Sequence, residues 1–444
     1  MNGRRIQRFV DHPAGGGKAA MRWLGDALGR LGRGLRRAQQ FEQLLYQTVR
    51  RVPAGVAQNT GATPARYEEL VNARELPDRP MPLTRFERAV PGEAALTERM
   101  ARLAAETVIA NYCAMAGSDA FVNAMRDQHA KSHGCIKAEF IVRSDLPAEF
   151  TTRLFRPGAR YPAILRLSNG NGRLQSDRRI DARGMSIKLH GVDAPSFLHT
   201  LAPSRTSAGE HDFALSSFPV FFCKDAVDYA ALMDAVSAPH RTLAERLGWL
   251  AGWAAFILRH PRQFFIFLEV GLVSLATIRN PLTATYHSMS PYLFGEDKVV
   301  RYMVGPARPQ NASARWRSFL SWPRSENFLQ NALLADLNPA IHRPDEDFAL
   351  DFSVRVRHAA GPDDAEDASR WWNAPRDRTV RLARIEIPRQ DFLEPNRRFD
   401  CEHMMINPWN CLPEHRPLGS INRMRLAVYL SSLQIRQKMN MVTS

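Results

Sequence analysis

A series of short alternating segments constrains the fold of this chain most strongly. Apolar and polar residues alternate in IKAEFIVR (136–143), TTRLFRPG (151–158), YPAILRLSN (161–169) and GMSIKLHG (184–191), and Pro, Gly, Asn and Asp separate these segments. A period of two with turn-forming residues between the segments is typical of antiparallel strands. The pattern returns in FALDFSVRVRH (348–358) and VRLARIEIP (380–388). These segments predict an antiparallel sheet or barrel.

Helical patterns surround the alternating segments. The stretch EAALTERMARLAAETVIANYCAMAG (93–117) predicts a strong helix, residues from about 225 to 279 are mostly helical in pattern, and residues 418–439 predict a C-terminal helix. The order α, β, α, β, α favours the α+β class, with a barrel core and surrounding helices.

The first 58 residues form a basic amphipathic arm ahead of a main domain over residues 59–444. Residues 1–60 contain eleven Lys or Arg against three Asp or Glu, which gives +8 of the formal +15. Between residues 21 and 52, leucines at helical spacing alternate with arginines, so this segment either lies on an anionic membrane or docks on the main domain. The chain has no zinc-finger spacing and no RNA-binding aromatic signature, and we expect no nucleic-acid partner.

Two apolar runs lie close together, LGWLAGWAAFIL (247–258) and FFIFLEVGLVSLATI (264–278). Charged residues between them, and Glu269 within the second, leave neither run with the roughly 18 to 20 uncharged residues that span a bilayer. The runs predict buried helices. The alternative is a hairpin over 247–278 that rests on a membrane.

The cysteines and histidines offer only weak metal or disulfide signals. Five scattered cysteines without a C-x-x-C pair argue against a disulfide framework and favour a reducing compartment, so we expect a cytoplasmic location, free or peripheral at a membrane. Cys401, His403, Cys411 and His415 are zinc-ligand types, but their spacing is not a familiar zinc pattern. His129 and His133 are four residues apart and could share a metal on a helix face.

The residues around His129 indicate a different chemistry. The string Arg126-x-x-His129-Ala130-Lys131, followed by an alternating strand, resembles the distal histidine segment of the heme catalase family. Further blocks resemble that family in the same order: RLSNG (166–170), DARGMSIKL (181–189), HDFALSSFPVFFCKD (211–225) and RLAVYLSSLQIR (425–436). With NPWNCLPEHRPLG (407–419), the chain looks most like the short catalase-related branch, which includes uncharacterised bacterial proteins and relatives of allene oxide synthase.

The resemblance implies acid/base residues on the distal side of a heme. His129 matches the histidine that takes a proton from the peroxide and returns it to the leaving oxygen, and Ser168 matches the serine that fixes its ring. Where catalases have an asparagine that polarises peroxide, the alignment gives Ser217, and a shift of one residue gives Ser216. Gln128 stands where catalases usually have valine.

The resemblance also implies heme b as the cofactor and a set of residues that hold it. Tyr429 matches the tyrosine whose phenolate binds the heme iron in catalases. Arg425 lies four residues earlier, so on a helix its guanidinium can stabilise that phenolate. Tyr229 matches a phenylalanine that stacks on the heme. The arginines that match the partners of the heme propionates are Arg126, Arg166 and Arg436.

These departures change the expected activity. A serine in place of the distal asparagine weakens the expectation of efficient hydrogen peroxide dismutation, and the apolar runs favour a lipid hydroperoxide met at a membrane face. The resemblance therefore implies a peroxidase or an enzyme that cleaves or rearranges organic hydroperoxides. The alternative is a catalase-like heme or lipid binding protein without turnover. Family resemblance also makes a homo-oligomer plausible.

Overall fold

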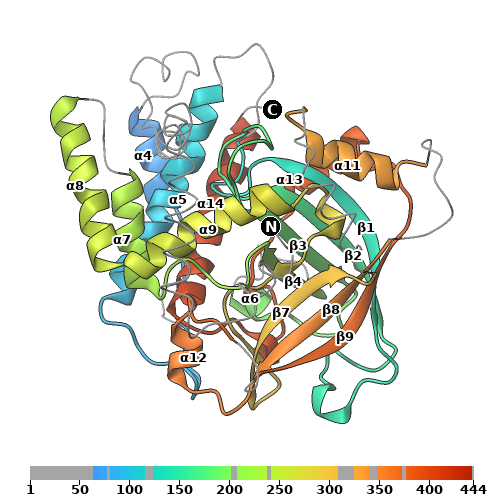
Figure 1. Ribbon diagram of the computed structural model, residues 1–444. Coiled ribbons are helices and arrows are strands. Elements are labelled where there is room, and N and C mark those ends of the chain that lie inside the picture. The colour runs from blue at the N-terminus through green and yellow to red at the C-terminus, as the bar shows by residue number, and fades with distance from the viewer. Residues whose placement is uncertain are drawn as a thin grey trace, which may run out of the picture.

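An eight-stranded antiparallel barrel forms the centre of the protein (Figure 1). The computed structural model describes residues 64–77, 81–115, 124–201, 208–237, 242–308, 325–339, 348–372 and 377–442, so the arm predicted over 1–58 lies outside the described residues. The strands pair in the order β1-β2-β3-β4-β5-β7-β8-β9, and β9 pairs back with β1. The closed antiparallel barrel confirms the sequence prediction.

The strand bounds follow most of the alternating segments. The strands are β1 (Ser132–Val142), β2 (Arg160–Asn169), β3 (Arg183–His190), β4 (Glu210–Ser216), β5 (Tyr286–His287), β6 (Tyr292–Phe294), β7 (Lys298–Pro306), β8 (Phe348–Arg357) and β9 (Asp377–Ile387). The short strand β6 pairs with β7, and its Tyr292 forms an isolated bridge with Pro417.

Aromatic side chains fill the inside of the barrel. The ring of Phe352 lies 5.1 Å from that of Phe140 and 4.8 Å from that of Phe213, and Tyr302 lies 5.0 Å from Phe213. Because side chains alternate between the two faces of a strand, the residues between these positions point out of the barrel toward the helices. The outer face is therefore available for a functional site.

One alternating segment does not form a strand. Residues 151–158 form a loop after a 3₁₀ turn, η2 (Ala148–Phe150). The hydroxyl of Thr152 accepts a hydrogen bond from the amide of Phe155, and the neighbouring side chains of Leu154 and Phe155 are both buried. The local side-chain bond stabilises a turn, and this outweighs the strand-like alternation.

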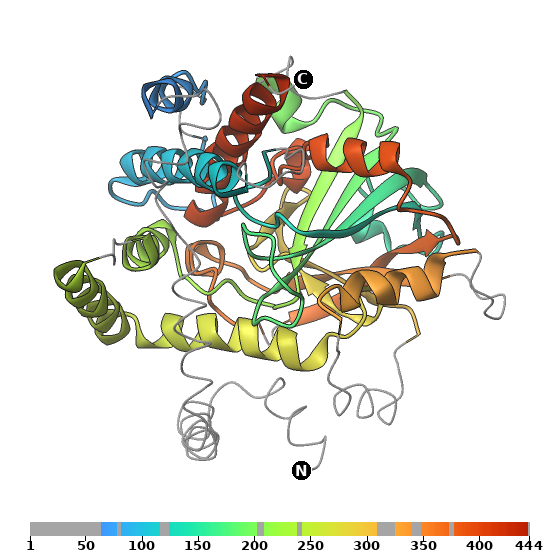
Figure 2. The same cartoon turned by 90° about the horizontal axis from the view of Figure 1, so that it is seen from above.

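Most of the helices lie to one side of the barrel, as Figure 2 shows from above. The long C-terminal helix α14 packs along α5, and the bounds of these two helices confirm the sequence prediction. No helix among the described ranges is long and apolar enough to cross a bilayer. The helices are α4 (Pro64–Asn72), α5 (Glu93–Met115), α6 (Phe197–Leu201), α7 (Ala226–Ser237), α8 (Leu243–Arg259), α9 (Pro261–Thr277), α11 (Phe328–Leu337), α12 (Pro362–Glu366), α13 (Pro395–His403) and α14 (Ser420–Val442).

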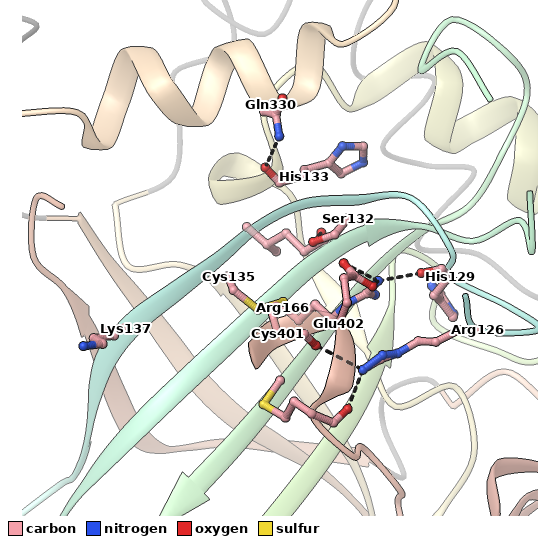
Figure 3. Close-up of a disulfide and its surroundings, with 12 residues drawn as sticks. Arg126, His129, Ser132, His133, Cys135, Lys137, Arg166, Gln330, Cys401 and Glu402 are labelled. Carbon is pink, nitrogen blue, oxygen red and sulfur yellow. Dashed lines mark hydrogen bonds and ion pairs between the residues drawn. A yellow bond between two sulfur atoms is a disulfide. The ribbon is translucent and has the colours of Figure 1, made fainter. Parts of the chain in front are cut away.

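The cysteines argued against a disulfide framework, and the described residues contain one disulfide and three free cysteines. Cys135 on β1 and Cys401 on α13 form a disulfide that joins positions 266 residues apart (Figure 3). Sequence spacing gives no sign of this bond, because only the tertiary fold brings α13 to the barrel. A disulfide-bonded Cys401 is not a thiolate ligand, and the described part of the chain contains no group of three side chains suited to a metal ion.

Candidate functional site

A loop that precedes β1 places His129 beside the ends of β2 and β3. The amide of His129 donates to the carbonyl of Gly170 at 3.0 Å, and the amide of Ala130 donates to the carbonyl of Asn171 at 3.1 Å. His129 has a φ of 60°, in the left-handed region that side chains other than glycine rarely adopt. Such a conformation is kept only where surrounding contacts enforce it, which is common at functional sites.

The ring of His129 is held through its Nδ1 atom. Nδ1 lies 2.9 Å from the carbonyl oxygen of Asn169 and 3.1 Å from the hydroxyl of Ser168. A carbonyl oxygen can only accept, so we assign the proton to Nδ1, which leaves a free lone pair on Nε2. Burial, and then the positive charge of Arg166, lowers the pKa of His129 to about 4. The imidazole is therefore neutral at neutral pH and can act as a base.

A glycine makes room for this ring. A Cβ atom on Gly184 of β3 would lie 2.4 Å from Nδ1 of His129, 2.5 Å from its Cε1 and 3.0 Å from the hydroxyl oxygen of Ser168. Ordinary contacts begin near 3.4 Å, so any larger residue at position 184 would displace the histidine. The sequence reasoning missed Gly184, because a glycine in a strand does not reveal which ring it contacts.

Strand register decides which serine faces the histidine. Gly184 pairs with Ser168 on β2 and with Ser216 on β4, and directly opposed residues in antiparallel strands point to the same face. Ser216 therefore shares the face of His129. Ser217 is turned elsewhere: its hydroxyl accepts from the amide of Arg183 at 3.0 Å and lies 2.7 Å from the hydroxyl of Ser274 on α9. The geometry favours Ser216, the alternative given by the one-residue shift.

His133 belongs to a buried polar network behind the site. Its Nε2 lies 3.0 Å from the side-chain oxygen of Asn169, whose amide nitrogen donates to Asp177 at 3.0 Å. Lys131 forms an ion pair with Asp177 at 2.7 Å. These contacts fix Asn169, whose main-chain carbonyl holds His129. His133 therefore supports the site from behind and does not share a ligand with His129.

Helix α14 carries the tyrosine and its arginine. The guanidinium Nη2 of Arg425 donates to the phenolic oxygen of Tyr429 at 3.1 Å, as their spacing of four residues predicts. Arg425 also donates to the side-chain oxygen of Asn422 at 3.0 Å, which orients it. The positively charged guanidinium therefore lies against the Tyr429 oxygen.

The histidine and the tyrosine–arginine pair belong to one site. The charge of Arg425 contributes to the lowered pKa of His129, so the two groups lie within electrostatic range of each other. His129, Arg425 and Tyr429 are each only half-buried, although they lie among helices and strands.

A cluster of three buried arginines flanks the histidine, as Figure 3 shows for Arg126 and Arg166. Arg126 lies in the loop, Arg166 on β2 and Arg436 on α14, as the resemblance implies. Burial, and then the charges of Arg166 and Arg436, holds the pKa of Arg126 well below its ordinary value. Each of the three guanidinium groups keeps a buried nitrogen without a hydrogen-bond partner: Arg126 Nη1, Arg166 Nε and Arg436 Nε. Such groups are suited to carboxylates of a bound molecule.

One carboxylate of the chain itself reaches the arginine cluster. An oxygen of Glu402 lies 3.2 Å from Nη2 of Arg166, and Arg436 donates to the main-chain carbonyl of Glu402 at 2.9 Å. Burial alone would raise the pKa of Glu402, but the neighbouring guanidinium groups of Arg166 and Arg126 lower it overall. The sequence reasoning missed Glu402, since its neighbours were considered only as zinc ligands.

The two remaining predicted residues differ in their surroundings. Tyr229 on α7 lies among aromatic rings, 5.9 Å from Phe221 and 6.3 Å from Phe222. Burial, and then the charge of Asp127, raises its pKa well above the ordinary value. Asp127 precedes Gln128 in the loop, so Tyr229 lies close to that loop. Gln128 itself is exposed.

Solved structures with a similar fold are catalases. A bacterial catalase has a TM-score of 0.50 and 14% identity over 85% of this chain and 70% of its own. Catalase A from Saccharomyces cerevisiae has a TM-score of 0.47 and 15% identity over 81% and 68%, and a fungal catalase has 0.44 and 14% over 81% and 68%. No family model and no curated protein matches the sequence. The fold of this chain is therefore catalase-like.

Proposed function

We propose that this chain is a heme-dependent enzyme that cleaves or rearranges the O–O bond of a peroxide. The observation that carries the proposal is the pairing of a neutral, ring-fixed His129 with an arginine-bonded Tyr429 in one site. The residues fit a heme b: Tyr429 offers a phenolic oxygen to iron, and the buried arginines offer unpaired N–H groups to two carboxylates. A bound heme would supply the electrons for O–O cleavage.

The roles of the protein residues follow from their geometry. His129 accepts the proton of the peroxide at Nε2 and returns it to the departing oxygen, while Ser168 and Asn169 keep the ring in place. Arg425 favours negative charge on Tyr429, which makes the tyrosine a stronger ligand. Ser216, on the same face, offers one hydroxyl donor in place of an amide.

We further propose organic hydroperoxides as the substrates, as in the short catalase-related branch, with weak turnover of hydrogen peroxide. A hydroxyl donor is shorter than an amide, so it supports a small peroxide less well. An aromatic cluster adjoins the site beside Tyr229 and suits an apolar substrate. It extends through Phe222, Phe267, Trp253 and Trp249 to the inner face of α8.

The test of the enzyme proposal is spectroscopic first and kinetic second. Protein supplied with heme should show a Soret band that shifts or disappears in Tyr429→Phe. His129→Ala should keep the pigment and lose peroxide cleavage, because the base is removed while the ligand remains. Turnover of hydrogen peroxide much faster than of a fatty-acid hydroperoxide would refute the substrate assignment.

A second candidate function, binding of heme or lipid at a membrane without turnover, rests on the outer face of α8. Leu243, Leu247, Leu250 and Leu258 recur at helical spacing and are 75%, 60%, 55% and 81% exposed. Exposed Arg259 lies beside this stripe, which suits an anionic phospholipid surface. The apolar runs are thus buried on one side of α8 and exposed on the other.

Vesicle flotation tests whether the outer face of α8 binds membranes. Leu247→Glu with Leu258→Glu should abolish binding to vesicles that contain phosphatidylglycerol, while Leu174→Glu, at an exposed leucine elsewhere, should not. Equal binding by both variants would refute the role of α8. A dimer of the wild-type chain that dissociates in the α8 variant would instead assign this face to a second copy.

A further inference from the structure

The C-terminal end of α13 supplies main-chain and side-chain acceptors to the arginine cluster. Arg126 donates to the carbonyl of Met404 at 2.6 Å and of Cys401 at 3.4 Å, and Glu402 provides its carboxylate and its carbonyl to the other two arginines. Carbonyls at a helix C-terminus carry partial negative charge. We call residues 401–404 the acceptor segment, because it occupies N–H groups that a carboxylate ligand also requires.

The disulfide fastens this acceptor segment to the barrel. Cys401 is the residue next to Glu402, and Cys135 is on β1, the strand that follows the loop of His129 (Figure 3). The side chain of Arg397 contacts Gln390 at 3.0 Å, and His403 lies 3.3 Å from Asn440. The disulfide adds a covalent link to these contacts and holds Cys401, the neighbour of Glu402, against β1.

We propose that the Cys135–Cys401 disulfide is a redox latch that holds Glu402 in the arginine cluster and thereby limits access of carboxylate ligands to it. The proposal rests on the proposed heme site, since the heme propionates are the carboxylates concerned. With the latch closed, three guanidinium groups and one carboxylate give the cluster a net charge of +2. With the latch open, the charge is +3 and Nη2 of Arg166 loses its contact with Glu402, so a ligand carboxylate can take that place while Nη2 still donates to the carbonyl of His129.

A dithiol reductant opens the latch by reducing the disulfide, and the atoms and electrons of this reaction balance. A thiolate of the dithiol attacks one sulfur of the disulfide, and its second thiol then resolves the mixed disulfide. The products are two cysteine thiols in the protein and one disulfide in the reductant, with two electrons and two protons transferred. A peroxide closes the latch: it oxidises one thiol to a sulfenic acid with release of an alcohol or water, and condensation with the second thiol releases water.

Metal-free protoporphyrin IX separates carboxylate binding from iron ligation. Oxidised full-length protein and protein reduced with dithiothreitol are titrated with the porphyrin, and tryptophan quenching gives each Kd. We expect about tenfold tighter binding after reduction, because a charged hydrogen bond of roughly 1.5 kcal/mol no longer competes. The dimethyl ester of the porphyrin, which lacks the carboxylates, should show no such difference.

Variants show which residues cause the change in porphyrin affinity on reduction. Cys135→Ser with Cys401→Ser should bind the porphyrin as the reduced wild type does, whatever the redox state, while Cys113→Ala should respond to reduction as the wild type does. Glu402→Gln should bind tightly with the disulfide intact, which tests the latch without removing the covalent link. A Kd that is unchanged both by reduction and in Glu402→Gln overturns the proposal.

Hydrogen exchange provides a readout that needs no ligand. Reduction should increase amide exchange in residues 395–404 and leave the barrel strand β8 unchanged. If the porphyrin binds to no form of the protein but α13 exchanges faster on reduction, the heme site fails and the latch is supported. If α13 exchange does not change on reduction, the latch is refuted even where heme binds.

Discussion

Replacing Gly184 with alanine tests whether the fixed position of the His129 ring controls catalysis. The added Cβ would lie 2.4 Å from Nδ1, about 1 Å inside an ordinary contact, so the ring must move by about that distance. A shift of this size would stretch the 2.9 Å and 3.1 Å hydrogen bonds to Asn169 and Ser168 beyond bonding distance. Loss of both bonds and overpacking together should destabilise the protein by about 1–3 kcal/mol.

The kinetic effect of Gly184→Ala should exceed its effect on heme binding. A displacement of about 1 Å in a catalytic group can reduce a rate by about 100-fold. We therefore expect a loss of this order in peroxide cleavage, with the Soret band retained because the atoms nearest to the added Cβ belong to His129 and Ser168 and not to Tyr429. Gly252→Ala on α8 is the matched control, since a Cβ there meets no neighbouring atom within 4 Å.

The result that would refute this reasoning is specific. If Gly184→Ala cleaves peroxide at a rate within about twofold of that of Gly252→Ala, the position of the histidine ring beside β3 does not control the reaction. If instead the Soret band is lost, the substitution acts on the heme and not on the histidine alone.

Four further predictions concern charge and register. Arg425→Leu should weaken heme binding by about tenfold or more and shift the Soret band, because negative charge on Tyr429 loses its partner; an unchanged spectrum would contradict this. The kcat/KM for peroxide should be constant from neutral pH down to about 5 and fall near the His129 pKa of about 4, since protonation at Nε2 removes the base. That pKa lies below the ordinary 6.5, so stability should also decrease as the pH falls from 6.5 through 4, measured by urea unfolding. Ser216→Ala should slow peroxide cleavage about tenfold, and Ser217→Ala should mainly lower Tm; the reverse result would restore Ser217 as the donor.

The sequence allowed prediction of those features that local pattern encodes. Alternation predicted most of the barrel strands, and apolar spacing predicted α5 and α14. The segment 151–158 alternates equally well, but a hydroxyl-to-amide bond turns it into a loop. Closure of the sheet through the two-residue strand β5 could not be predicted, because a segment that short carries no periodic signal.

The contacts of the candidate site also divide into those that local spacing predicts and those that it does not. Arg425 and Tyr429 lie four residues apart on one helix, so their contact follows from helical spacing. The choice between Ser216 and Ser217 depends on strand register, and a register shift of one residue exchanges the two faces. Glu402 reaches Arg166 across 236 residues, and no local pattern indicates such a contact.

The same positive charges act on both functional groups of the candidate site. The proposed peroxide cleavage needs a neutral histidine as the base. After burial, the charges of Arg166, Arg126 and Arg425 keep protons off His129, and the same Arg425 donates to the Tyr429 oxygen. Arginine suits this role because its ordinary pKa lies far above neutral pH. In the proposed enzyme, the arginines therefore keep the base neutral and hydrogen-bond to the tyrosine, in addition to their proposed binding of carboxylates.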